Sequence, residues 1–201
     1  MILENKLGIK DQIELSKMEE KISKLGAKEL FDSGKLNELI PGTYESLKTI
    51  HKYLFDKIYN FAGETRKENI AKGNFRFAPL IYLDDSIKKI EQMPQKTFDE
   101  IVEKYVEMNV AHPFREGNGR SLRIWLDDML KKEINKAVDW SLIDKEKYLI
   151  AMVNSTTDDK EIKQLIKNAL TDKIDDRELY MKGIDHSYFY EGYKEYKTSE
   201  L

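Results

Sequence analysis

The 201-residue chain contains no cysteine, which excludes disulfide scaffolds, thiolate zinc sites and cysteine nucleophiles. It has only three histidines, His51, His112 and His186, too few to favour a metal site built from several imidazoles. No apolar run approaches the length needed to cross a bilayer, and the N-terminus lacks the apolar stretch of a signal peptide. We therefore expect no membrane partner and a cytoplasmic location.

The chain also has little net charge, because 34 basic residues face 37 acidic ones for a formal charge of -3. A general nucleic-acid binder shows a basic excess, so nucleic acid is not expected as the primary ligand. A local pocket for anions remains compatible with this balance. The length suits a single domain over residues 1–201 with a hydrophobic core of its own.

Four prolines and ten glycines leave room for long helices. Apolar residues that recur every three or four positions, together with capping residues such as Thr97, predict a mainly α protein. One segment differs: the residues around Lys72, Gly73 and Asn74 predict the turn of a small β-hairpin whose strands are Asn69-Ile70 and Phe75-Arg76-Phe77, with an irregular surface loop as the alternative. Helices are predicted over about 11–25, 43–59, 84–93, 97–110, 118–134, 142–154, 159–172, 174–182 and 186–197.

The chemically informative segment is residues 111–123, AHPFREGNGRSLR. His112 precedes a proline that should end a helix, and its imidazole can accept a proton near neutral pH. Glu116 offers the oxygen ligand that Mg²⁺ prefers beside phosphate oxygens. The backbone of Gly117–Gly119 can form an anion cradle at the start of the next helix. Arg120 and Arg123 share one face of that helix, where a polyanion would explain two cations near an N-terminus.

Each of these features alone has a blander interpretation. A histidine before a proline is more often a helix-end residue, a Gly-Asn-Gly sequence is usually a turn, and paired arginines on a helix are usually solvated. Their ordered combination within a dozen residues is far more specific. It predicts phosphoryl or nucleotidyl transfer, in which the protein supplies positioning and charge.

The string HPFREGNGRSLR resembles the signature of the Fic family, H-x-F-x-[D/E]-G-N-G-R-x-x-R, at every specified position. The segments IHKYLFDKIYNFAGETR and KGNFRFAP resemble the same family, so the similarity covers a Fic core of about residues 40–170. The resemblance implies a Fic-fold helical bundle with a β-hairpin flap. It also implies transfer of AMP from ATP to a Tyr, Thr or Ser hydroxyl of a target protein.

The resemblance assigns roles to the motif. His112 would remove the proton of the target hydroxyl, and Glu116 would hold Mg²⁺, with Mn²⁺ or Ca²⁺ as alternatives. Gly117, Asn118 and Gly119 would bind the α- and β-phosphates, Arg120 would support the phosphate pocket, and Arg123 would anchor the γ-phosphate. Tyr148 resembles a position that contacts adenosine. The flap (Lys72, Gly73, Asn74 and Phe75) would pair with an extended target segment by β-augmentation.

A second pattern lies near the C-terminus. Ser187, Glu191 and Gly192 match the inhibitory pattern [S/T]-x-x-x-E-[G/N] of a Fic subgroup, within the helix predicted over about 186–197. Glu191 could pair with Arg123 and remove the guanidinium meant for the γ-phosphate. The alternative is an exposed tail helix whose aromatic residues pack on the core.

Other functions stay open at this stage. Glu191 could instead position a water for removal of AMP, and relatives on this fold transfer phosphate or phosphocholine. The intact Gly117–Gly119 sequence favours AMP transfer over phosphate transfer, and nothing in the sequence separates the addition of AMP from its removal. A catalytically silent interaction module is the remaining class, which the complete motif disfavours. Self-modification of the tyrosine-rich tail and a homo-oligomer are further expectations.

Overall fold

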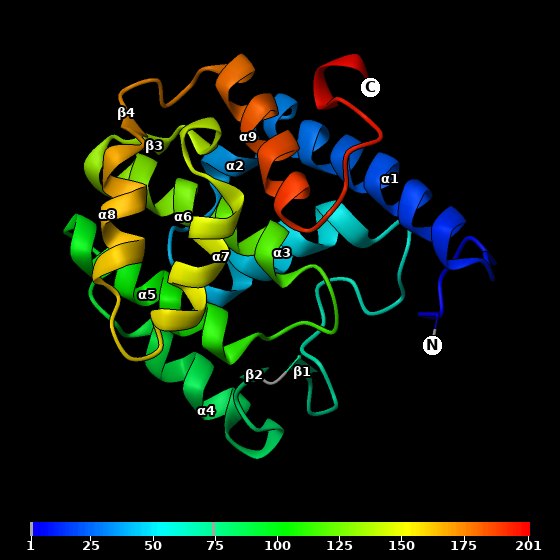
Figure 1. The fold of residues 1–201 in the computed structure, drawn as a ribbon, viewed down its shortest axis with the longest axis horizontal. Coiled ribbons are helices and arrows are strands. Elements are labelled where there is room, and N and C mark those ends of the chain that lie inside the picture. The colour runs from blue at the N-terminus through cyan, green and yellow to red at the C-terminus, as the bar shows by residue number, and fades with distance from the viewer. Residues whose placement is uncertain (1, 74) are drawn as a thin grey trace.

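The computed structural model describes residues 2–73 and 75–201, so Asn74 of the predicted flap lies outside the described residues. The fold is mainly α, as predicted, and Figure 1 shows the helices gathered into one bundle. The helices are α1 (Gln12–Asp32), α2 (Lys35–Glu38), α3 (Tyr44–Phe55), α4 (Leu80–Glu91), α5 (Phe98–Ala111), α6 (Asn118–Ile134), α7 (Lys145–Asn154), α8 (Lys160–Asn168) and α9 (Arg177–Tyr190). Short 3₁₀ turns, η1 (Trp140–Leu142) and η2 (Thr198–Glu200), complete the helical part.

The core is organised around α6, which contacts α3, α5 and α9. Trp125, Leu126 and Met129 of this helix have no exposed surface, and the indole of Trp125 donates to the carbonyl of Thr43, 3.0 Å away. The predicted span of 118–134 is confirmed. Since α6 is covered on several sides, the residues at its start are held by the packing of the whole bundle.

Local sequence signals account for the helix ends around the motif. Thr97 and Glu100 form the predicted capping box at the start of α5. This helix ends at Ala111, and His112 takes the left-handed conformation with φ of 51°. Pro113 cannot continue the helix, so the chain turns sharply at His112.

The predicted hairpin is confirmed: β1 (Ala71–Lys72) pairs antiparallel with β2 (Phe75–Arg76). The first strand lies two residues after the expected Asn69-Ile70, so Lys72 belongs to the strand and not to the turn. A second small ladder, β3 (Ala137–Val138) with β4 (Leu170–Thr171), was not predicted. Strands of two residues are too short to carry a periodic signal, and β4 lies where helix was expected up to residue 172.

Other boundaries also differ from the prediction: α3 ends at Phe55 and not at 59, α4 begins at Leu80 and not at 84, and α2 was not predicted. Two further differences involve glycines. Gly26 does not stop the first helix, which continues to Asp32. A Cβ at Gly26 would lie 2.1 Å from the Tyr53 carbonyl oxygen, so this glycine allows α1 and α3 to approach closely. The helices expected over 174–182 and 186–197 are one helix, α9, which ends at Tyr190. None of the helices in residues 2–73 and 75–201 is long and apolar enough to cross a membrane.

Candidate active site

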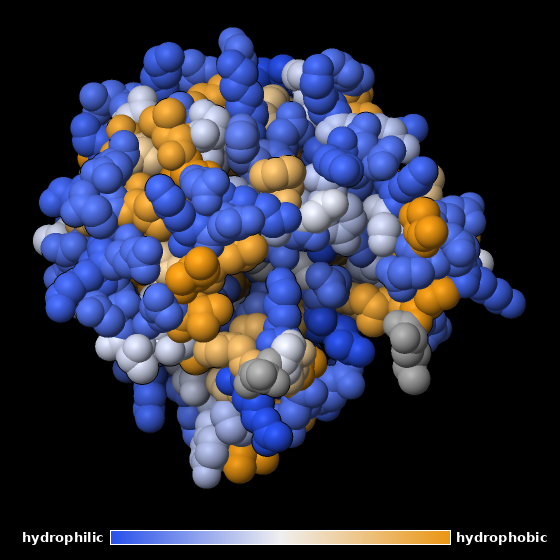
Figure 2. Space-filling view, viewed as in Figure 1, coloured by the Kyte–Doolittle hydropathy of each residue, from blue (hydrophilic) through white to orange (hydrophobic). Residues whose placement is uncertain are grey.

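The loop between α5 and α6 opens into a cleft of about 550 Å³. The walls come from the flap, the loop, the start of α6, one face of α7 and Glu191 just after α9. Figure 2 shows this face of the molecule hollowed above the flap, with hydrophobic residues gathered over α7 beside the hollow. The structure thus brings the flap, the motif and the C-terminal pattern to one place.

His112 is oriented by its backbone neighbour. Its Nδ1 lies 3.0 Å from the carbonyl oxygen of Asn109, so Nδ1–H donates and Nε2 is left as the acceptor. The ring of Phe77 stacks on the imidazole with 3.5 Å between centroids. Burial, followed by the positive charges of Lys72 and Arg66, lowers the pKa of His112 to about 4. The imidazole is therefore neutral at pH 7, with the Nε2 lone pair available to accept a proton.

The loop holds its own shape through Asn118. The side-chain amide of Asn118 accepts from the Phe114 N–H and donates to the Phe114 carbonyl, each at 2.8 Å. This side chain is buried and closes the loop, so what it can offer a phosphate is its backbone N–H. Gly117 precedes it with φ of 77°, and a Cβ there would lie 2.3 Å from the ring of Phe55. Only glycine fits this position.

The first turn of α6 presents an electropositive end to the cleft. The N–H groups of the first helical residues have no intrahelical acceptor, and the helix dipole adds partial positive charge there. Gly119 has no side chain at this end of the helix, and the Glu191 carboxylate comes so close that a Cβ would lie 2.6 Å from it. The arrangement suits a phosphate group.

Arg120 and Glu116 are paired. Arg120 is buried at the start of α6, and its Nη2 lies 3.2 Å from Oε1 of Glu116. That same carboxylate oxygen accepts from the Gly117 N–H at 3.0 Å. Glu116 is 46% exposed, so its carboxylate faces the cleft while Arg120 lies behind it.

Arg123 donates to every partner around its planar group. Its Nε donates to the Ser187 hydroxyl at 2.7 Å, and Nη2 donates to the Ser187 carbonyl at 2.9 Å and to Oε1 of Glu191 at 2.8 Å. Nη1 reaches the hydroxyl of Tyr148 at 3.4 Å. Tyr148 is buried, lines the cleft and also bonds to the hydroxyl of Tyr105. In this structure each nitrogen of the guanidinium donates to a group of the protein itself.

Glu191 occupies the cleft as a charged group. Burial raises its pKa, but Arg123 and then Lys72 outweigh this and lower the pKa of Glu191 to about 2. The Lys72 contact comes from the flap, with 3.4 Å between Nζ and Oε2. The carboxylate therefore links α6 and the flap.

The backbone conformation after Glu191 requires the glycine at position 192. Glu191 is the C-cap of α9, Gly192 has φ of 96°, and the N–H groups of Gly192 and Tyr193 bond to the carbonyls of Phe189 and Tyr188. These two bonds form a Schellman motif, which needs a residue of positive φ directly after the cap. The motif ends the helix at Tyr190, so that Glu191 lies directly after the last helical residue. Residues 191–192 thus form a turn, where helix was predicted to 197.

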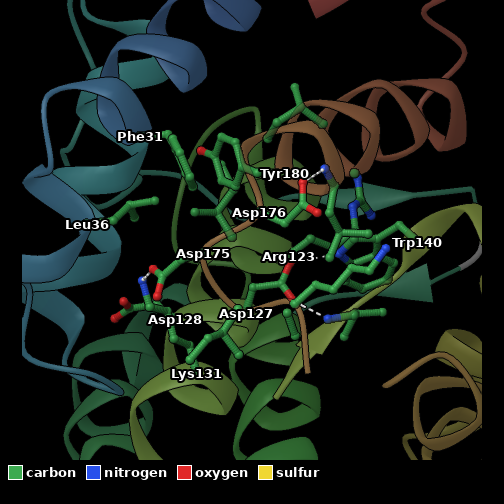
Figure 3. Close-up of a pocket in the computed structure, with 18 of the residues that line it drawn as sticks. Phe31, Leu36, Arg123, Asp127, Asp128, Lys131, Trp140, Asp175, Asp176 and Tyr180 are labelled. Carbon is green, nitrogen blue, oxygen red and sulfur yellow. Dashed lines mark hydrogen bonds and ion pairs between the residues drawn. The ribbon is translucent and has the colours of Figure 1, made fainter. Parts of the chain in front are cut away.

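A second cavity of about 260 Å³ lies between α2, α6 and α9, with Arg123 and Ser187 among the residues that line it. Figure 3 shows its acidic residues, with Asp127 and Asp128 on the side of α6 and Asp175 and Asp176 on the segment before α9. Both carboxylate oxygens of Asp127 accept bonds that join α6 to β3 and η1, from the Val138 N–H and the Trp140 indole. This cavity contains neither the loop nor His112, so we place the chemistry in the larger cleft.

Two residues that position the loop were not assigned a role from the sequence. His51 was interpreted as a satisfied core histidine; its Nδ1 accepts from the Gly63 N–H, and Nε2–H donates to the Glu116 carbonyl at 2.9 Å. Arg66 is buried and donates to the carbonyls of Glu68, Ala78, Ala111 and His112. Arg66 lies in the segment FAGETR, whose likeness to the family was the only available signal.

Comparison with known sequences agrees with this geometry. The model of the Fic/DOC family matches residues 41–130, which include the loop and most of α6. These residues of the chain are therefore a Fic-type domain.

Curated relatives extend the likeness beyond the matched residues. The protein adenylyltransferase VbhT of Bartonella schoenbuchensis is 32% identical over an alignment of 187 residues, which covers 85% of this chain and 37% of VbhT. The chain thus spans little more than a third of that relative. The probable protein adenylyltransferase y4lH of Sinorhizobium fredii is 27% identical, over 79% of this chain and 85% of its own length.

Solved structures share the fold. The BepC protein of Bartonella tribocorum, determined with bound AMPPNP, superposes with a TM-score of 0.68 at 21% identity, over 85% of this chain and 93% of BepC. An N-terminal Fic domain from Bartonella quintana with bound ADP gives a TM-score of 0.67 at 24% identity, over 84% of this chain and 90% of that domain.

Proposed function

We propose that this chain is a protein adenylyltransferase that transfers AMP from ATP to a Tyr, Thr or Ser hydroxyl of a target protein. The proposal rests on three features that line one cleft: the neutral imidazole of His112, the N-terminus of α6 and Arg120, the third residue of that helix. The names of the relatives, and the nucleotides bound to BepC and to the Bartonella quintana domain, support the same chemistry.

In this reaction His112 is the general base. Its Nε2 takes the proton of the target hydroxyl, whose oxygen attacks the α-phosphorus of ATP. The bond from that phosphorus to the bridging oxygen of the β-phosphate breaks, and pyrophosphate leaves. The bond from Nδ1–H to the Asn109 carbonyl keeps the acceptor nitrogen facing the reaction.

The phosphates are held by the start of α6. The backbone of Gly117, Asn118 and Gly119 provides N–H groups for the α- and β-phosphates, and Arg120 supports that pocket from behind Glu116. Arg123 binds the γ-phosphate when its guanidinium is released, and Tyr148 contacts the adenosine. Fixed donors of this kind stabilise the charge that develops during the transfer.

Mg²⁺ fits this donor set. The described residues contain no cluster of three or more His, Asp or Glu side chains that could hold a metal, so the protein's ligand would be the single carboxylate of Glu116 beside phosphate oxygens. Mg²⁺ is commonly bound in that way, through one or two carboxylates and the substrate's phosphates. When bound, it would neutralise charge on the phosphates.

The flap is the target-docking element. Its short strands β1 and β2 lie at the mouth of the cleft, and Lys72 and Phe75 are among the residues that line it. An extended target segment could pair with the hairpin edge through main-chain bonds and bring its hydroxyl near His112. Such pairing would tolerate varied side chains around the modified residue.

The same site is self-inhibited by Glu191. A γ-phosphate and this carboxylate compete for Arg123, whose Nε and Nη2 also donate to Ser187 and whose Nη1 donates to Tyr148. ATP would then bind with its phosphates misplaced, and a displacement of about 1 Å can cost on the order of a hundredfold in rate. Ser187 holds the guanidinium, and Gly192 ends the helix so that the carboxylate reaches it.

Labelled ATP tests the proposal. We expect the Glu191→Gly variant to transfer label from [α-³²P]ATP to protein and none from [γ-³²P]ATP. Adding His112→Ala to that variant should abolish the transfer. Transfer of γ-label would indicate a kinase, and unchanged labelling after His112→Ala would refute the role of the imidazole.

A further inference from the structure

Glu19 of α1 is a buried carboxylate at the back of the loop. It is 4% exposed, and its Oε1 accepts from Nη1 of Arg120 at 2.7 Å and from the Tyr193 hydroxyl at 2.6 Å. Its Oε2 accepts from the hydroxyl of Tyr59. Glu19 precedes the residues matched by the family model, and it is 101 positions from Arg120 in the chain.

The charges of Glu19 and Arg120 depend on each other. Burial raises the pKa of Glu19, but Arg120 and the two tyrosine hydroxyls more than offset this, so the pKa is lowered and the group is ionised. Glu19 in turn helps to raise the pKa of Arg120 against the effect of burial. A buried ion pair of this kind leaves an uncompensated charge when one partner is removed.

Arg120 divides its planar group between two carboxylates. Nη1 bonds to Glu19 at 2.7 Å, whereas Nη2 is 3.2 Å from Glu116. The guanidinium is also enclosed by the rings of Phe55, Tyr188 and Tyr193, at 4.8, 5.3 and 4.9 Å from their centroids. The shorter bond and the buried partner make Glu19 the main counter-charge of Arg120.

We infer that Glu19 is a positioning residue for the nucleotide site, acting on Glu116 through Arg120. Because Glu19 neutralises Arg120, the pairing with Glu116 is long and the exposed carboxylate stays available to a metal ion on the nucleotide. Without the charge of Glu19, Arg120 would pair more closely with Glu116 and compete with that metal ion. This inference rests on the proposed function, in which Glu116 holds the metal beside the phosphates.

The test compares Glu19→Gln with Glu20→Gln, both made in the Glu191→Gly variant. Glu20 is the adjacent carboxylate of α1 and is 1% exposed. It pairs with Lys24 and accepts from the N–H groups of Glu195 and Tyr196, so it has the same burial without a bond to Arg120. Both substitutions should lower the melting temperature.

Calorimetry then measures ATP affinity with Mg²⁺ and with EDTA for each variant. We expect the gain in affinity due to Mg²⁺ to be roughly tenfold smaller after Glu19→Gln, as for other partners that orient a metal ligand. After Glu20→Gln the gain should equal that of the parent. The inference would be overturned if the Mg²⁺-dependent gain in ATP affinity of Glu19→Gln stayed within about twofold of the parent's. It would also be overturned if Glu20→Gln reduced that gain as much as Glu19→Gln does.

This design separates the inference from the proposed function. If the parent binds ATP in a Mg²⁺-dependent way but transfers no AMP, the proposed transferase activity fails. The comparison of Glu19→Gln with Glu20→Gln still decides the role of Glu19 in that case, because it measures binding.

Discussion

Replacing Glu191 with glycine should release Arg123 and raise AMP transfer strongly. The structure gives a scale for the effect, since the pKa of Glu191 is lowered from 4.5 to about 2. A difference of that size corresponds to roughly 3 kcal/mol in favour of the ionised carboxylate at this site. If the γ-phosphate must displace that carboxylate, its removal should increase the rate on the order of a hundredfold.

The assay is transfer of label from [α-³²P]ATP to protein at saturating ATP, for the wild type and for Glu191→Gly. Glu191→Gln is a useful intermediate, because it keeps the side-chain shape and removes the charge. Lys72→Ala tests the weaker contact of the same carboxylate: Lys72 is 75% exposed and lies 3.4 Å from it, so this contact should contribute less than about 1 kcal/mol.

Acid should not mimic the substitution. A lowered pKa means that the ionised carboxylate contributes fully above the ordinary value of 4.5 and is lost only as the pH falls through about 2. Inhibition should therefore persist at pH 5. Equal labelling by the wild type and Glu191→Gly, or release of the wild type at pH 5, would refute the reasoning.

Three further outcomes follow from the geometry. In the Glu191→Gly variant, kcat/KM should decrease as the pH falls to about 4, because His112 becomes protonated there. A decrease that already begins near pH 6.5, the ordinary pKa of histidine, would contradict the burial of this base. Gly192→Ala strains a residue with φ of 96° by about 1 kcal/mol and should raise labelling by roughly fivefold; unchanged labelling would mean that the helix end does not hold the carboxylate. Gly117→Ala should lower the melting temperature and AMP transfer together, because its Cβ would overlap the ring of Phe55, and normal stability by calorimetry would count against this packing.

Local patterns predicted the helical part of the fold well. The span 118–134 matches α6, and the capping box at Thr97 marks the start of α5. These features depend on neighbours three or four residues apart, so the chain carries their signal locally. The flap hairpin was predicted for the same reason, since the sequence Lys72-Gly73-Asn74 is a local turn signal.

Glycines show where local interpretation failed. Gly26 was interpreted as a helix stop, yet it lies in α1 where the backbone of Tyr53 approaches. Gly183 fell between two predicted helices, yet it lies inside α9 against Trp140. A glycine that ends a helix and one that allows close packing look alike in sequence, because the difference lies in a distant segment.

The sequence by itself determined the chemical groups of the site and the order in which they follow α5, since HPFREGNGRSLR carries them within one loop and one helix turn. Tertiary structure alone decided which groups face each other. The bond of Arg123 to Ser187 and Glu191, the cover of Phe77 on His112 and the buried carboxylate of Glu19 behind Arg120 join residues 35 to 101 positions apart. Such contacts depend on how the helices pack, because the free energy of burying a charge or a ring is set by the whole surrounding core.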